Sequence, residues 1–299
     1  MADAVGTVRR WAERHRSLAA LILRAKPDRS RHLFVVGVPG SHTCHPFLIQ
    51  TPSLLRFLQN VHSQNGEDGV VAEIFRRLEK TSPGWFVEFG AWDGKYLSNT
   101  FTLLEQGWSG VYIEGDSARF EDLKATRDQY PERVTAIKAF VDVHGTSSLD
   151  SILAKTATPP DFDLLSIDID SYDYWIWDSV RFYRPKIVII EINSAYPPGV
   201  HYVSPPDVCL PEEQSGQSFS STIQLGRSKG YFPVCHTGNL IFARADLVGK
   251  LALPTRELRH PDLLFVDSWL PVSRKRRFRV ERLLKNCVAY IERSVGFPG

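Results

Sequence analysis

The chain has 299 residues, 43% of them hydrophobic and 23% charged, a balance typical of a globular protein. Its net charge of +2 predicts binding neither to nucleic acid nor to a membrane surface, and no apolar run is long enough to span a bilayer. The four cysteines lie far apart and form no CxxC pair. We interpret them as free thiols in a reducing compartment, with the cytoplasm as the default location.

The N-terminal part differs from the rest of the chain in its pattern. Residues 1–25 predict a basic amphipathic helix, and residues 30–50 predict an irregular segment that prolines interrupt. This part is our candidate for the contact surface of a possible homodimer. The predicted divisions are an N-terminal helical extension (1–60), a main domain (61–250) and a basic C-terminal extension (251–299).

In the main domain, apolar runs of strand length alternate with stretches of helix length. Such alternation, with nearly all-apolar strands, predicts an α/β doubly wound, Rossmann-like fold whose mostly parallel sheet is covered by helices on both faces. A hairpin-like pattern at 231–243 predicts a last strand that runs antiparallel. The predicted strands are 85–89, 110–114, 134–141, 163–167, 186–191, 231–234 and 240–243, and the predicted helices are 98–107, 117–128, 147–155, 173–182 and 218–229.

An acid stands at or beside the carboxyl end of each of the first five strands. Ligands of open α/β sheets bind beyond these ends. Acids also cap the helices that follow such strands, but five in register favour a shared site. They are Glu88, Glu114, Asp142, Asp168 and Glu191.

The first two strands carry the strongest ligand signal. Gly90 allows a tight turn and a close backbone approach to a ligand. Glu114, about twenty residues beyond this loop, stands where an acid can bind two ribose hydroxyls. Neither G-x-G-x-x-G nor G-K-[ST] occurs in the loop, so a pyrophosphate cradle is poorly supported. The pattern therefore predicts a nucleoside site.

Two further regions are candidates for acceptor binding. Residues 194–216 are rich in Pro, Ser and Gly and are long for a plain connection, which favours a lid or a recognition loop. Aromatic residues at 172–177 could stack on a ligand or pack on the sheet, and packing is our interpretation for Trp177. His201 and His236 lie in loops that could cover an acceptor, and each is also readily explained as an ordinary loop histidine.

Taken in order, these motifs resemble those of class I S-adenosylmethionine-dependent methyltransferases, and within them the FkbM-like group that methylates hydroxyls of sugars and related natural products. The resemblance implies seven strands with the last one antiparallel. This chain has Ser171-Tyr172 where relatives often have Gly-Asn, which leaves the shape of the acceptor pocket open. The matching segments are SQNGED (63–68), FVEFGAWDG (86–94), VYIEGD (111–116), DLLSIDID (163–170) and PKIVIIEIN (185–193), within roughly residues 60–245.

The resemblance also implies roles in binding S-adenosylmethionine. Glu88 and the Gly90 loop would face the amino-acid end of the cofactor, Glu114 the ribose, and Asp142 the adenine. Gln64 and Asn99 could complete the methionine pocket. The predicted cofactor-binding set is Gln64, Glu88, Gly90, Asp93, Asn99, Glu114, Asp142 and Asp168.

Methyl transfer to an alcohol needs a group that removes the proton, either a positioned base or a divalent metal. Asp168, Glu191 and Asn193 offer hard oxygen ligands that suit Mg²⁺ or Ca²⁺. Our hypothesis is that Asp168 and Glu191 bind Mg²⁺ and that Asp170 assists, although Asp170 could instead cap the next helix. The predicted catalytic residues are Asp168, Asp170 and His201.

The leading prediction is thus an O-methyltransferase that acts on a sugar hydroxyl in a saccharide, glycan or glycosylated metabolite. An NAD-dependent oxidoreductase would use the same acid for its ribose, but the glycine-rich fingerprint is missing. A non-catalytic, methyltransferase-like binding subunit is the third alternative. An inactive site, however, would not be expected to retain a cluster of like charges, because such a cluster is destabilising.

Overall fold

The structure is a computed structural model. It describes residues 52–270 except 170–171, 207–209 and 212–213, together with strands at 33–37 and 44–48 and residues 275 and 278. Residues Pro52–Leu270 form one compact unit. The predicted helix at 1–25 and the predicted catalytic residue Asp170 lie outside the described residues. So does the part of the basic C-terminal extension after residue 270, apart from residues 275 and 278.

The segment predicted to be irregular at 30–50 contains a hairpin instead. Strand β1 (Leu33–Gly37) pairs antiparallel with β2 (Cys44–Leu48), and Val35 stands opposite Pro46. A proline has no N–H to give to a ladder, but both members of a two-stranded ribbon are edge strands and tolerate one. Pro46 therefore did not exclude a strand, and the prediction was wrong here.

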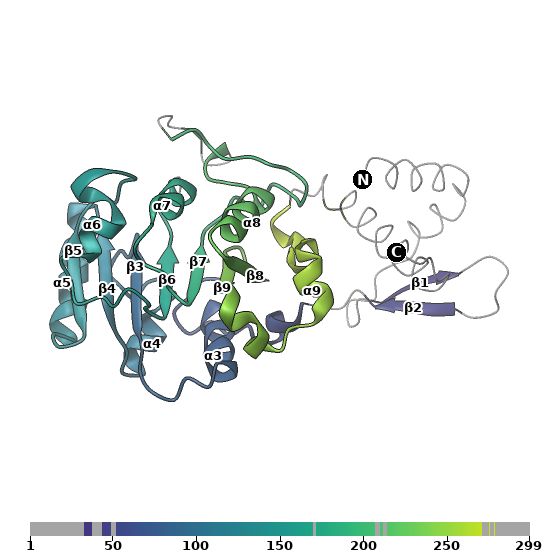
Figure 1. The fold of residues 1–299 in the computed structure, drawn as a ribbon, viewed down its shortest axis with the longest axis horizontal. Helices are drawn as coiled ribbons and strands as arrows, with labels where there is room; N and C mark the ends of the chain where they lie inside the picture. The colour runs from purple at the N-terminus through teal and green to yellow at the C-terminus, as the bar shows by residue number, and fades with distance from the viewer. Residues whose placement is uncertain are drawn as a thin grey trace. The chain divides into compact units, whose positions relative to one another are not determined.

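The compact unit is built on a seven-stranded sheet in the order β5-β4-β3-β6-β7-β9-β8 (Figure 1). Strand β9 runs antiparallel to both neighbours, and the other pairings are parallel. The predicted doubly wound fold with an antiparallel last strand is confirmed. The strands are β3 (Trp85–Phe89), β4 (Ser109–Glu114), β5 (Val134–Lys138), β6 (Leu164–Ile167), β7 (Ile187–Ile190), β8 (Tyr231–His236) and β9 (Leu240–Arg244).

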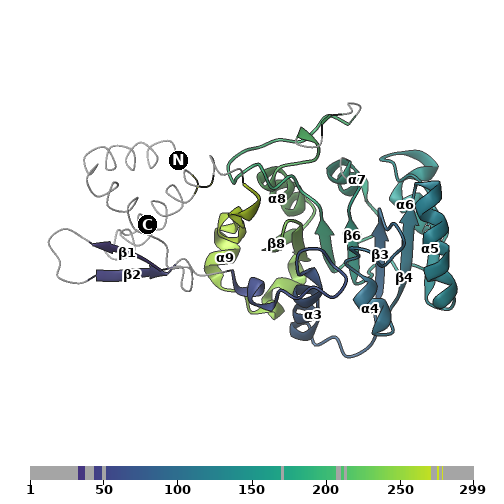
Figure 2. The ribbon, with the colours of Figure 1, turned by 180° about the vertical axis from the view of Figure 1, so that it is seen from behind.

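Helices cover both faces of this sheet. Figures 1 and 2 show α3 and α4 on one face and α6, α7 and α8 on the other. The apolar strands are buried between these layers, and Trp177 of α7 packs its ring against Phe242 and Tyr231, which confirms its predicted packing role. The helices are α3 (Glu67–Arg77), α4 (Phe101–Glu105), α5 (Ser117–Gln129), α6 (Leu149–Leu153), α7 (Asp173–Ser179), α8 (Phe219–Ser228) and α9 (Thr255–Arg259).

Strand β5 ends earlier and helix α4 begins later than predicted, and both differences enlarge loops at the carboxyl edge of the sheet. Strand β5 ends at Lys138, so residues 139–142 are free to form a wall. Helix α4 begins at Phe101 because the Ser98 hydroxyl accepts the backbone N–H groups of Thr100 and Phe101, a local alternative to helix that apolar periodicity does not reveal.

Residues on both flanks of the sheet region belong to the same compact unit. Leu54 near its beginning and Phe265 near its end are almost fully buried. The backbone N–H and hydroxyl of Ser53 donate to the Glu257 carboxylate at 3.0 and 2.7 Å and join the two flanks. Among the described residues, no helix is long and apolar enough to cross a membrane.

The strand order reverses between β3 and β6. From β3 the chain adds β4 and then β5 on one side, and it returns to build β6 and β7 on the other. In open α/β sheets, ligands bind at such a switch point, beyond the carboxyl ends of the strands. Gly90 follows β3 and Asp168 follows β6, so these two loops border the expected crevice.

Candidate active site

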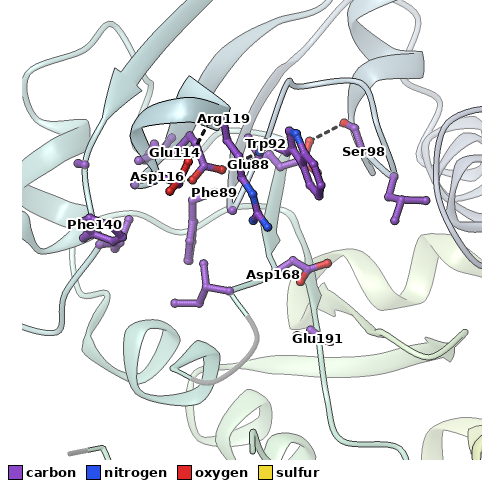
Figure 3. Close-up of a pocket in the computed structure, with 18 of the residues that line it drawn as sticks. Glu88, Phe89, Trp92, Ser98, Glu114, Asp116, Arg119, Phe140, Asp168 and Glu191 are labelled. Atoms are coloured by element: carbon purple, nitrogen blue, oxygen red, sulfur yellow. Dashed lines mark hydrogen bonds between the residues drawn. The ribbon is translucent and has the colours of Figure 1, made fainter. Parts of the chain in front are cut away.

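A cavity of about 770 Å³ lies at the carboxyl edge of the sheet, at this switch point (Figure 3). Its volume is in the range of small-molecule and cofactor sites. The acids predicted to meet at this edge all line it: Glu88, Glu114, Asp142, Asp168 and Glu191. Five consecutive parallel strands thus deliver an acidic residue to one cavity.

Gly90 forms the floor where the two central loops touch. Its φ is +74°, in the left-handed region, and a Cβ there would overlap the carbonyl oxygen of Asp168. The N–H groups of Gly90 and Ala91 both donate to the Ile113 carbonyl, at 3.1 and 3.2 Å. Only glycine permits this conformation and this contact together, so the backbone itself is exposed to whatever fills the cavity.

Glu114 is the last residue of β4, and its carboxylate already accepts two hydrogen bonds from the protein. One oxygen accepts the backbone N–H of Trp92 at 2.8 Å, and the other accepts that of Asp116 at 2.7 Å. A carboxylate offers about four lone-pair sites, so two remain for a ligand. The two bonds fix the carboxylate against the cavity, with 5% of the residue exposed.

Glu88 lines the same cavity, but its bonds run into the protein. Its carboxylate accepts the hydroxyls of Ser98 and Thr100 at 2.7 and 2.5 Å and the N–H of Asn99 at 3.0 Å. Burial raises the pKa of Glu88, and these bonds oppose that rise. The arrangement suits a residue that shapes the 98–100 loop.

Two other predicted cofactor residues make hydrogen bonds within the protein and do not line the cavity. The Asp93 carboxylate accepts the N–H groups of Lys95 and Tyr96, which closes a tight turn. The Asn99 amide donates to Ser166 at 3.1 Å, and 4% of Asn99 is exposed. Neither residue lines the cavity, so the structure gives both a supporting position.

Residues that the sequence did not single out complete the cavity. The guanidinium carbon of Arg119 lies 4.2 Å from the centre of the Trp92 ring, and both side chains line the cavity (Figure 3). Phe140, 78% exposed, packs over Gly115 beside Asp142 and provides a flat apolar wall. The position of Arg119, early in the helix after Glu114, was the available signal in the sequence, whereas the early end of β5 that frees Phe140 appears only in the structure.

The SQNGED segment is a scaffold that presents Gln64. The Asp68 carboxylate accepts the backbone N–H groups of Val61, His62 and Ser63. Burial acts to raise the pKa of Asp68, but hydrogen bonds from Ser63 and Thr102 outweigh it and lower this pKa overall. Its neighbour Glu67 is also fully buried and accepts the hydroxyl of Thr237 at 2.6 Å. Gln64 follows the backbone segment that Asp68 binds and precedes Glu67. Its side chain is exposed and lines the cavity.

A second cavity of about 510 Å³ adjoins the first one and shares Gln64, Asp168 and Glu191 with it. Asn193, a predicted metal ligand, lines this second cavity. Its Oδ1 accepts the Ala195 N–H at 3.2 Å and its Nδ2 donates to the Ser215 carbonyl at 2.9 Å. The side chain thus ties the turn after β7 to the end of the long loop.

The candidate histidines take different positions. His201 is exposed and lines neither cavity. His236 is buried between Phe219 and Phe265, where its Nδ1 accepts the Val266 N–H at 2.8 Å. That bond leaves the ring proton on Nε2, which lies 2.8 Å from the Ser194 hydroxyl. Burial lowers the pKa of His236 to about 3, so the ring is a neutral packing element.

The described residues contain no cluster of three His, Cys, Asp or Glu side chains arranged to hold a metal ion. Asp168 and Glu191 do share an edge of both cavities. Mg²⁺ is commonly held by one or two carboxylates while water completes its shell, so the metal hypothesis rests on this pair alone among the described acids.

No family model and no curated protein matches the chain. Solved structures resemble it at low identity. A SAM-dependent methyltransferase from Aquifex aeolicus is 12% identical, covers 64% of this chain and 90% of its own, and has a TM-score of 0.37. WbdD, solved with a kinase inhibitor, is 10% identical, covers 64% of this chain and 47% of its own, and has a TM-score of 0.40.

A carbon methyltransferase, CurJ, is 10% identical, with 60% of this chain and 52% of that chain covered and a TM-score of 0.39. This chain therefore spans about half the length of WbdD and of CurJ. At these values the likenesses carry no argument about substrate or chemistry, and the proposal below depends on the site itself.

Proposed function

We propose that the protein is an S-adenosylmethionine-dependent O-methyltransferase that acts on a sugar hydroxyl. The observation that carries this proposal is the cavity at the switch point, in which a buried acid at the end of β4 keeps two acceptor positions for ribose hydroxyls. The adjoining second cavity supports it, because methyl transfer requires an acceptor beside the cofactor.

The residues present fit the cofactor. Gly90 lets the cofactor approach the backbone, Glu114 would hold its ribose, and Phe140 would pack on its adenine. When bound, the cofactor supplies a methyl group on a sulfonium, which is already activated for displacement. The task of the protein is then to hold a hydroxyl in line with that methyl group and to accept its proton.

Asp168 is our proposed proton acceptor. It borders both cavities, so its carboxylate can hold an acceptor hydroxyl at their junction. When a hydroxyl is methylated there, its proton would pass to this carboxylate. Asp170 and His201 stay predictions as assisting residues, and so does Mg²⁺ held by Asp168, Glu191 and Asn193. Unchanged turnover after exhaustive chelation would exclude the metal hypothesis.

The site disfavours the oxidoreductase alternative. A dinucleotide's pyrophosphate usually meets a helix N-terminus directly after the first glycine loop. Here, α4 begins only at Phe101, spans five residues, and is separated from Gly90 by the loop that Glu88 organises. The non-catalytic alternative would show cofactor binding without turnover on any saccharide.

The test is calorimetric titration with S-adenosylhomocysteine. We expect micromolar binding by the natural chain and at least tenfold weaker binding by Glu114→Gln, because the ribose hydroxyls lose a charged acceptor, about 1.4 kcal/mol or more. Glu121→Gln is the matched control, since that exposed residue of α5 pairs only with Lys124 in the described structure. Equal affinities for the two variants, or preferential binding of NAD, would overturn the proposal.

A further inference from the structure

We propose that Gln217 and Trp269 form a carbohydrate-binding subsite in the second cavity, with the Gln217 side-chain carbonyl accepting a hydroxyl of the methyl acceptor. The inference rests on the proposed function and deepens it. It goes beyond the strand-end acids because both residues come from segments far from them in sequence, at the end of the long loop and near the end of the compact unit.

The first observation is an unsatisfied acceptor. Gln217 is 1% exposed and lines the second cavity, yet its Oε1 has no hydrogen-bond partner among the described residues. Buried polar atoms without a partner are rare in folded proteins, because each one has lost its hydrogen bond to water without replacing it. This oxygen has almost no accessible surface, so a ligand hydroxyl would have to displace the side chains around it, and would then satisfy it.

The orientation of this amide is fixed by its surroundings. The Nε2 of Gln217 donates to the main-chain carbonyl of Glu191, and its own main-chain carbonyl accepts the Asn193 N–H at 2.9 Å. A flipped amide would place two carbonyl oxygens against each other. Oε1 is therefore the atom left over, and it can only accept a hydrogen bond.

The second observation is the chemistry of the rest of the wall. Asp168 and Glu191 border one part of the cavity, and Trp269 borders another. Trp269 is 43% exposed and packs closely on Gly238. Acceptor oxygens combined with an open aromatic ring suit a molecule that has several hydroxyls and an apolar C–H face, which describes a pyranose.

The position of the subsite agrees with its proposed use. A sugar held by Gln217 would lie in the cavity that shares Asp168 and Glu191 with the proposed cofactor cavity. Gln217 does not line the cofactor cavity. Its replacement should therefore affect acceptor binding and leave cofactor binding intact.

The test follows the indole N–H resonance of Trp269, assigned with Trp269→Phe, during titration with methyl α-D-glucoside, -mannoside and -galactoside and methyl α-L-rhamnoside in the presence of S-adenosylhomocysteine. We expect at least one pyranoside to shift this resonance, and Gln217→Met to weaken that binding at least tenfold. Affinity for S-adenosylhomocysteine should remain within about twofold.

Ser204→Ala is the matched control for a purely structural effect. The Ser204 hydroxyl accepts the Gly216 N–H at 3.1 Å, so its loss loosens the same segment, and Ser204 does not line the cavity. Equal loss of pyranoside binding in both variants, or no shift with any pyranoside when S-adenosylhomocysteine binds, would overturn the inference. Absence of S-adenosylhomocysteine binding would instead overturn the proposed function.

Discussion

At the scale of single residues, Gly90 shows how a position can be required for two independent reasons. Its φ of +74° disfavours any side chain, and the Asp168 carbonyl occupies the space that a Cβ would need. The sequence showed a glycine in a loop after a strand. It could not show the second reason, because residue 168 comes from a strand that follows much later in the chain.

We expect Gly90→Ala to lower the free energy of unfolding by roughly 2–5 kcal/mol, since left-handed strain and steric overlap add. The measurement is urea denaturation followed by circular dichroism. Gly145→Ala is the control, because Gly145 has a similar φ of +69° but nothing within 4 Å of the Cβ position. It should cost only about 1–2 kcal/mol, and equal costs for the two variants would contradict the steric argument.

The candidate site was predictable from the sequence where a residue sits at a strand end. Glu114 and Asp168 could be placed in this way, because parallel strands bring their carboxyl ends to one edge. Gln217 could not, since it follows a long loop without periodicity, and only the fold reveals that its amide oxygen is buried without a described partner. Site residues that lie in loops can be identified only from the tertiary structure.

At the scale of elements, His236 joins three segments that are separate in sequence. It ends β8, bonds to Ser194 in the turn after β7, and accepts the N–H of Val266 near the end of the unit. The sequence allowed a catalytic loop histidine here. The structure buries the ring because β8 extends two residues further than predicted, to His236 itself.

Burial of neutral His236 predicts a pH dependence of stability. Its pKa falls from 6.5 to about 3 on folding, so between these values the unfolded chain binds more protons than the folded chain. This contribution to stability is fully present above pH 6.5 and is lost as the pH falls toward 3, by at most about 1.4 kcal/mol per pH unit. Urea denaturation from pH 7 to pH 4 measures it.

His236→Phe keeps the aromatic stack and removes the titrating group. We expect it to be less stable than the natural chain at pH 7, because two hydrogen bonds are lost, with the gap narrowing as the solution is acidified. The exposed His144→Gln serves as control and should follow the natural chain. A gap that stays constant from pH 7 to pH 4 would exclude His236 as the source.

At the scale of the whole molecule, alternation of strands and helices was enough to predict the fold, because all seven apolar runs predicted as strands belong to the sheet. The boundaries of the compact unit were harder to predict from the sequence. The short helix η1 (Ser53–Phe57) and the η5 turn (Pro261–Leu264) have too few residues to show a period, yet they supply the buried Leu54 and Leu264.

These flanks lead to a prediction about fragments. Residues 52–270 should unfold in one cooperative transition and bind S-adenosylhomocysteine as the full chain does. A 61–250 fragment loses Leu54, Phe265 and the Ser53–Glu257 bonds. Each lost core side chain costs about 2–5 kcal/mol, so this fragment should lack a cooperative thermal transition. Equal melting temperatures of the two fragments would contradict this.

Gln64 could couple the two cavities thermodynamically. This one exposed side chain lines the cavity assigned to the cofactor and the cavity assigned to the acceptor, so the occupant of one space limits the conformations available for the other. If both ligands bind as proposed, each should change the affinity for the other by the same factor, because the coupling between two sites is reciprocal. Titration of one ligand at zero and at saturating concentration of the other measures that factor.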